Sequence, residues 1–304
     1  MPLLKKRWPL VLLVLVVIGV GTLFVAKPWR RQVEPTAQSV TPAPNASVAP
    51  SCLTLFRETC TWLKSQPVVL SPFSTPQLKV LNPTLNRDQY QGDNDRLLTY
   101  DNTNRDNLNQ AILPMFNELN QLARAYVETY TIAPLPKQTL LERLGKLRLV
   151  VQDRERCQRA NRPPVVGGSG DDEITICPLL THQPIGQLLT LIAHEYGHIV
   201  DPCTLADYTS GRVNSGSYDC TKNDEIEADK VSLVLSTQYL ERLQQTNPTA
   251  TATLLPTTPR DRMLYLVNFR IDTNCDTKEG EDWAAVWLSS AALSRQIGCV
   301  PEAL

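Results

Sequence analysis

The chain of 304 residues shows three kinds of hydrophobic pattern along its length. Residues 9–26 form an apolar run without a charged side chain, and as a helix this run would span about 27 Å, nearly the hydrocarbon thickness of a bilayer. Residues 27–51 are rich in Pro, Thr, Ser and Ala and lack a period, which is typical of a linker. Residues 52–104 mix Pro and Asn with short apolar pieces, the helical period dominates from Arg105 onward, and Glu173–Leu180 alternates as a strand does.

The helical spacing predicts a fold that is mainly α with a small β-sheet, an α+β class. Residues 52–104 are expected to be loops with one short helix over Cys52–Lys64, and the glycine-rich segment Gly167–Asp172 is expected to be a turn. Longer helices are predicted over residues 105–130, 138–159, 184–200, 224–242, 259–272 and 281–297.

The pentapeptide His194-Glu195-Tyr196-Gly197-His198 lies in the predicted helix 184–200 and has the form HExxH. Residues four apart share a helix face, so His194 and His198 can bind one metal ion, and Glu195 is placed to act on a metal-bound water. A helical projection puts both histidines away from the apolar stripe, which argues against a pair of packed core histidines. Gly197 costs helix stability, so it predicts a close approach by another backbone.

A catalytic zinc ion takes three protein ligands and leaves a fourth position for water. We choose Glu225 as the third ligand, because it opens a second helix and shares a face with Asp229. Asp201 is the runner-up, since it lies one turn beyond the motif, and Glu227 is less favoured because it projects away from Glu225. The only other histidine, His182, is interpreted as a loop residue.

An HExxH motif followed by a helix with Glu-x-x-x-Asp, here Glu225 and Asp229, resembles the gluzincin metallopeptidases. It is most similar to the group that contains the CaaX prenyl proteases and the bacterial HtpX-like membrane proteases. The resemblance implies that Glu225 binds zinc and that Asp229 orients a zinc-binding histidine from the second shell. It covers only Glu173–Tyr239, and that group often has several membrane spans and few cysteines. A divergent zincin-like catalytic core is therefore expected.

This core would hydrolyse peptide bonds with a zinc-activated water and Glu195 as general base. The strand Glu173–Leu180 is expected to be a sheet edge that pairs with an extended substrate. Tyr208, Arg212 and Tyr218 are candidates for stabilising the oxyanion. The alternatives are a non-catalytic zinc-binding, disulfide-stabilised domain, which would not need Glu195, and a disulfide-stapled module in which the motif arose by chance.

The cysteine content indicates an oxidising compartment. All eight cysteines follow the apolar run and none forms a CxxC pair, so disulfides are expected rather than a zinc ribbon. Because neighbouring cysteines close the shortest loops, the expected pairs are Cys52–Cys60, Cys157–Cys177, Cys203–Cys220 and Cys275–Cys299.

These features predict a single-pass membrane protein. Residues 1–8 would be a cytoplasmic tail and residues 9–26 an uncleaved signal anchor, with a cleaved signal peptide as the alternative. Residues 27–51 would tether an extracytoplasmic metallopeptidase domain, periplasmic or extracellular, over residues 52–304. Without the six basic residues of positions 1–31, the remaining 24 basic residues face 31 acidic ones. The expected partners are therefore a peptide or protein substrate and the membrane, with no nucleic acid.

Overall fold

A computed structural model describes most of the predicted domain. The described residues are 49–65, 74–90, 93–153, 155, 157, 167–169, 172–205, 220, 224–274, 277–278, 284–285 and 287–301. The predicted tail and anchor, and all but the last residues of the predicted linker, lie outside this set. Among the described helices, none is both long and apolar enough to cross a membrane.

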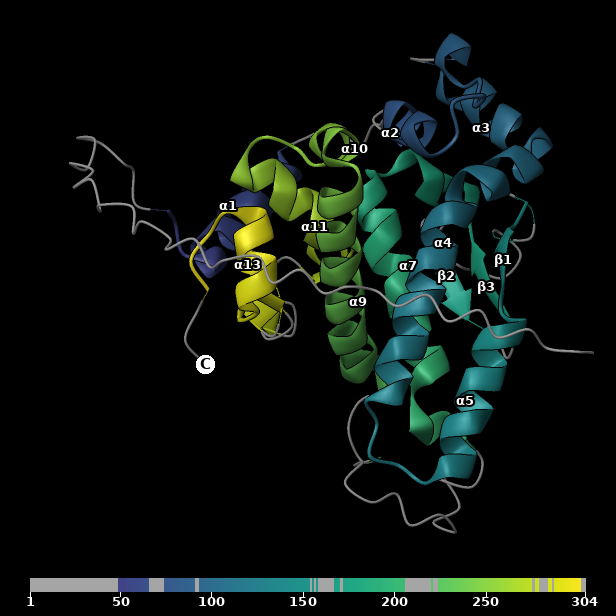
Figure 1. Ribbon diagram of the computed structural model, residues 1–304. Helices are drawn as coiled ribbons and strands as arrows, with labels where there is room; N and C mark the ends of the chain where they lie inside the picture. The colour runs from purple at the N-terminus through teal and green to yellow at the C-terminus, as the bar shows by residue number, and fades with distance from the viewer. Residues whose placement is uncertain are drawn as a thin grey trace, which may run out of the picture. The chain divides into compact units, whose positions relative to one another are not determined.

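The described residues are mainly helical with one small sheet, as the hydrophobic pattern predicts (Figure 1). The helices are α1 (Cys52–Lys64), α2 (Ser74–Leu81), α3 (Asn94–Thr103), α4 (Arg105–Glu128), α5 (Pro134–Lys146), α7 (Ile185–Val200), α9 (Asp224–Thr246), α10 (Pro248–Leu254), α11 (Pro259–Asn274) and α13 (Ala291–Ile297). Short 3-10 turns are η1 (Asp88–Tyr90), η2 (Pro178–His182) and η3 (Pro202–Thr204).

Helix α7, which carries the HExxH motif, lies between α9 and α4 and also packs against α11 (Figure 1). Every residue of α7 except His198 is buried. The apolar stripe predicted from sequence therefore describes only one side of the helix, because α9 covers the side that carries the histidines. Two polar side chains fix α7 to its neighbours. The Tyr196 hydroxyl donates to the Phe116 carbonyl of α4 at 3.0 Å, and Gln187 Nε2 donates to the Leu264 carbonyl of α11 at 3.1 Å.

The sheet contains β1 (Arg148–Val151), β2 (Gly167–Ser169) and β3 (Glu173–Ile176) in the order β1-β3-β2. Strand β3 pairs parallel with β1 and antiparallel with β2. The strand predicted over Glu173–Leu180 is confirmed for Glu173–Ile176, whereas the residues from Pro178 onward form η2. The expectation that the strand forms a sheet edge is wrong. Both of its sides are occupied by other strands, so its backbone groups are already paired. The outer strands of the described sheet are β1 and β2.

Two further predictions around the sheet are wrong. The helix predicted over residues 138–159 ends at Lys146, and β1 follows immediately. The segment Gly167–Ser169, expected within a turn, is strand β2. In both places pairing with β3 overrides the local pattern. Leu149 and Val151 of β1 pair with the buried residues Ile174 and Ile176, and β2 pairs antiparallel with the same strand.

Three helices lie where loops or a connection were expected, namely α2, α3 and α10. Capping side chains account for two of them. The Asp93 carboxylate accepts from the first turn of α3, and the Asn247 side chain does the same for α10. The helix predicted over residues 281–297 is interrupted near Ser290, whose side chain caps α13, and part of its first half lies outside the described residues.

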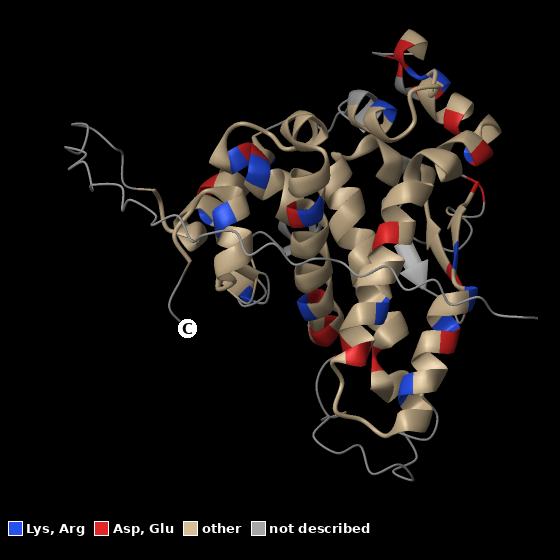
Figure 2. Ribbon diagram, in the orientation of Figure 1, with Lys and Arg blue, Asp and Glu red and all other residues tan. Residues whose placement is uncertain are grey.

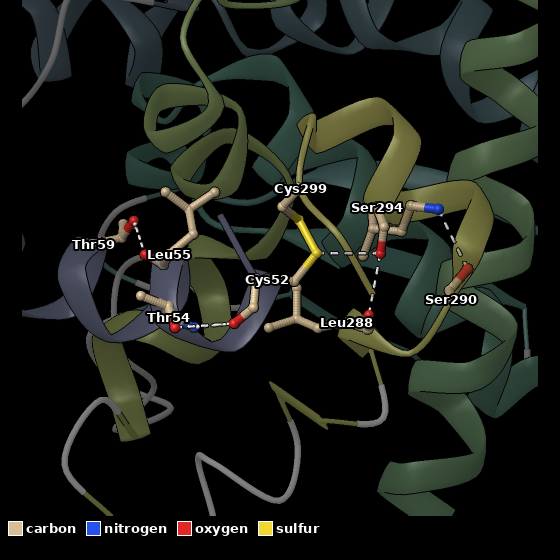
Figure 3. Close-up of a disulfide and its surroundings, with 10 residues drawn as sticks. Cys52, Thr54, Leu55, Thr59, Leu288, Ser290, Ser294 and Cys299 are labelled. Carbon is tan, nitrogen blue, oxygen red and sulfur yellow. Dashed lines mark hydrogen bonds between the residues drawn. A yellow bond between two sulfur atoms is a disulfide. The ribbon is translucent and has the colours of Figure 1, made fainter. Parts of the chain in front are cut away.

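The disulfides confirm two of the four expected pairs, Cys157–Cys177 and Cys203–Cys220. The other two are wrong, because Cys52 pairs with Cys299, which is 247 residues away in the sequence (Figure 3). Both Cys52 and Cys60 lie on α1, eight residues apart, which puts their Cα atoms about 12 Å from each other, beyond the reach of a disulfide. Cys60 is also disulfide-bonded.

The Cys52–Cys299 bond joins the two ends of the described domain. The Cys52 amide donates to the Val300 carbonyl at 2.9 Å, and the Val300 amide donates to the Pro50 carbonyl at 3.0 Å. Ser294 of α13 lies beside the sulfur of Cys52, with its Oγ at 3.3 Å (Figure 3). A covalent bond and two backbone hydrogen bonds therefore close the domain at its termini.

Candidate metal centre

Helices α7 and α9 bring three side chains with metal-binding atoms together. His194 and His198 come from the middle and the end of α7, and Glu225 comes from the first turn of α9. The Nε2 atoms of the two histidines are 3.1 Å apart. The Glu225 carboxylate lies 3.2 Å from His194 Nε2 and 3.6 Å from His198 Nε2. All three ligand atoms fall within 4.8 Å of one another, so a single metal ion can contact each of them.

Gly197 explains how the two helices come close enough. A Cβ atom at this position would lie 2.5 Å from the Ala228 Cα and 2.6 Å from the Ala228 carbonyl oxygen, both backbone atoms of α9. The close approach predicted from Gly197 is confirmed. One turn further along the same interface, the Ser232 hydroxyl donates to the Thr190 carbonyl of α7 at 2.7 Å. Small side chains on both helices therefore set the spacing of the ligands.

Asp229 contacts the other ring nitrogen of His194. Its Oδ1 lies 2.7 Å from His194 Nδ1, and both residues are almost fully buried. A hydrogen bond at Nδ1 fixes the imidazole ring and keeps Nε2 directed at His198 and Glu225. This is the geometry that the sequence resemblance implies for an aspartate four residues beyond the glutamate ligand.

The carboxylates around His194 determine its protonation in the metal-free protein. Burial is the largest single influence on the pKa of His194 and lowers it. Hydrogen bonds with Asp229 and Glu225, together with the nearby charges of Asp229 and Glu195, act in the opposite direction and outweigh burial. The net result raises the pKa of His194 from 6.5 to about 9. A cation is therefore favoured at this point of the structure.

The other sequence candidates are not part of this group. Within the part of the chain that the structure describes, the one group of His, Cys, Asp or Glu side chains with metal-binding spacing is His194, His198 and Glu225. Asp201 instead accepts a hydrogen bond from the Cys203 amide at 2.8 Å, and Glu227 forms an ion pair with Lys230 at 2.7 Å.

Glu195 follows His194 in α7 and is buried, with 6% of its surface exposed. The structure places it next to the ligands, while its role as general base stays a prediction. The three oxyanion candidates, Tyr208, Arg212 and Tyr218, lie outside the described residues.

The sequence did not reveal the position of His182. It ends the 3-10 turn η2 rather than lying in a loop, it is fully buried, and its Nε2 lies 2.6 Å from Asp101 Oδ2. The same carboxylate oxygen accepts from Arg87 Nη2 at 2.7 Å. The three residues come from separate segments, η2, α3 and the connection before η1, so no local spacing could have indicated the network.

The donors suit zinc. Two imidazole nitrogens and one carboxylate oxygen are a ligand set of catalytic zinc sites, in which a fourth position remains for water. The acidic first turn of α9, which contains Asp224, Glu225 and Glu227, adds negative charge beside this group (Figure 2). Comparison with protein-family models, curated proteins and solved structures finds no match to this chain. The functional argument therefore rests on the site itself.

Proposed function

We propose that this protein is a membrane-anchored, extracytoplasmic zinc peptidase of the gluzincin type, with His194, His198 and Glu225 as its metal ligands. The observation that carries the proposal is the convergence of these three side chains next to Glu195, with Asp229 on the remaining nitrogen of His194. The expected anchor in residues 9–26 and the disulfides support the proposed location.

The chemistry divides between the metal and the side chains of the two helices. When bound, zinc supplies a Lewis acid and lowers the pKa of a coordinated water to about 7. Glu195 accepts a proton from the attacking water and delivers it to the leaving amine as the C–N bond breaks. Because Glu195 is buried, little bulk water competes for that proton. Asp229 keeps the His194 ring in one orientation through both steps.

The sheet offers a second element of the proposal. Strand β2 packs against α7, and among the described strands it pairs only with β3. An extended peptide that adds to the outer side of β2 would lie along α7, where the metal ligands are. We therefore assign to β2 the pairing with substrate that was expected of Glu173–Leu180, because β3 is the central strand of the sheet.

The experiment compares metal content and proteolysis in the full-length protein and in Glu195→Gln. The wild type is expected to bind one zinc ion and to cleave an unfolded protein substrate. Glu195→Gln is expected to keep the zinc and to lose about 10²–10⁴ of the turnover rate, the usual contribution of a general base. Glu227→Gln is the control, since Glu227 pairs with Lys230 and is not a ligand. Zinc binding without proteolysis in the wild type would favour a non-catalytic zinc domain, and an active Glu195→Gln would refute the assigned base.

A further inference from the structure

The three proposed metal ligands differ in how strongly the fold restrains them. His194 and His198 belong to α7, which is surrounded by other elements, and 6% and 21% of their side chains are exposed. Glu225 is the second residue of α9, and 49% of its side chain is exposed. The first turn of a helix has no preceding turn to hold it and opens more readily than the middle. Glu225 is therefore the ligand that depends most on an additional restraint.

The Cys203–Cys220 disulfide lies close to the first turn of α9 in the sequence. Cys203 is five residues beyond His198, and Cys220 is five residues before Glu225. The bond holds the Cα atoms of the two cysteines 5.5 Å apart. It thus joins η3, which follows α7, to a cysteine that lies shortly before α9 in the sequence.

Cys203 is itself fixed to the body of the domain. The Asp201 carboxylate accepts from the Cys203 amide at 2.8 Å, and Thr204 accepts from Arg143 Nη1 of α5 at 2.8 Å. These contacts hold the short turn η3 against the end of α7 and against α5. A restraint on Cys203 is passed through the disulfide to Cys220.

We propose that the Cys203–Cys220 disulfide positions Glu225 for metal binding. The bond limits the movement of the start of α9, so that the Glu225 carboxylate stays within reach of His194 and His198. The inference rests on the proposed zinc site and adds a dependence of zinc affinity on one disulfide.

The second short disulfide provides a matched control. Cys157–Cys177 spans 20 residues and Cys203–Cys220 spans 17, so loop closure predicts nearly the same loss of overall stability when either bond is removed. Cys177 follows β3, and Cys157 lies beyond β1, so this bond does not join the segments that carry the ligands. The two disulfides therefore close loops of nearly equal length at different places in the fold.

The test measures zinc affinity in full-length Cys203→Ser/Cys220→Ser and Cys157→Ser/Cys177→Ser by competition with a chromophoric chelator. Removing Cys203–Cys220 is expected to weaken zinc binding by about 10–100-fold, as loss of a ligand's supporting contact does. Removing Cys157–Cys177 is expected to change it by less than about twofold, while both variants lose a similar amount of thermal stability. Equal zinc affinities in the two variants would overturn the proposal.

A double-mutant cycle with Glu225→Ala identifies the route of the effect. If the disulfide acts through Glu225, its removal has no further effect on zinc affinity once Glu225 is gone. A full additional loss in the Glu225→Ala background would contradict the proposal. If the wild type binds no stoichiometric zinc, the proposed function and this inference both fail. If the wild type binds zinc and the two disulfide variants match it, only this inference fails.

A measurement on the wild type covers the case in which the serine variants do not fold. The protein is treated with a phosphine reductant with and without zinc, and the released thiols are alkylated and mapped by mass spectrometry. If zinc and the disulfide hold the start of α9 in the same place, bound zinc reduces the local opening that exposes this disulfide to the reductant. Zinc is expected to slow reduction of Cys203–Cys220 and to leave Cys157–Cys177 unchanged. Equal protection of both, or of neither, would refute the proposal.

Discussion

The described part of the chain contains two buried histidine–aspartate pairs, and they differ in what surrounds the aspartate and the second ring nitrogen. In the first pair, His194 Nδ1 contacts Asp229 at 2.7 Å. Its Nε2 faces His198 and Glu225, so a second carboxylate and a second imidazole share the same space. The negative charge of this group is balanced either by a proton on His194 or by a metal ion.

In the second pair, His182 Nε2 contacts Asp101 at 2.6 Å. Arg87 lies against the same carboxylate and also donates to the Thr181 carbonyl at 3.1 Å. Arg87 and Asp101 have completely buried side chains, and they neutralise each other within the structure. Burial lowers the pKa of Arg87, and the charge of Asp101 and its hydrogen bond counteract that shift.

The comparison shows that a histidine held by a carboxylate does not by itself indicate a metal ligand. The first pair has metal-binding geometry because three donor atoms converge on one point. In the second pair Arg87 supplies the positive charge, and the network of Arg87, Asp101 and His182 connects η2, α3 and the segment before η1. The same substitution at the two aspartates should therefore affect different properties, mainly the stability at Asp101 and mainly the zinc affinity at Asp229.

The largest effect is expected for Asp101→Asn. The change keeps the shape of the side chain but leaves the buried Arg87 without a counter-charge, which should cost about 3–5 kcal/mol in the free energy of unfolding. Chemical denaturation of the metal-free protein measures this loss. Zinc affinity of the remaining folded protein should be unchanged, and a parallel loss of zinc would mean that the two pairs are coupled.

A smaller effect, on a different property, is expected for Asp229→Asn. The amide no longer supports His194 as a carboxylate does, so zinc affinity should fall by about 10–100-fold. The loss of stability should be smaller than for Asp101→Asn, because no buried arginine is left unpaired. Chelator competition and denaturation of both variants test the contrast, and the same profile in the two would remove the distinction between the pairs.

A pH dependence of zinc affinity at the first pair provides a test that needs no substitution. His194 has its pKa raised to about 9, so zinc must displace a proton below that pH, and affinity should rise by about tenfold per pH unit until it levels off near pH 9. Because the pKa is raised above the unfolded value, this group stabilises the metal-free fold fully below about pH 6.5, and the contribution is lost as the pH rises through about 9. Calorimetry in buffers of different ionisation enthalpy counts the protons released. No proton release at pH near 7.5 would contradict the raised pKa.

The sequence by itself determined the parts of the site that depend on local spacing. The helix period put His194 and His198 on one face of α7, and the position of Glu225 at the start of a helix made it the preferred third ligand. Gly197 indicated the close approach of a second backbone, which Ala228 provides. The two disulfides that close short loops were also predicted, since nearby cysteines meet with little loss of chain entropy.

The tertiary structure decided the features that depend on partners far away in the chain. Strand β1 exists because it pairs with β3, although its local pattern favours a helix. Cys52 pairs with Cys299 because the rigid α1 keeps Cys60 out of its reach. His182 is buried because Asp101 and Arg87 supply the charges that make its burial tolerable. The hydrophobic period of a helix or strand can be recognised from neighbouring residues, whereas contacts between distant segments depend on how the whole chain packs.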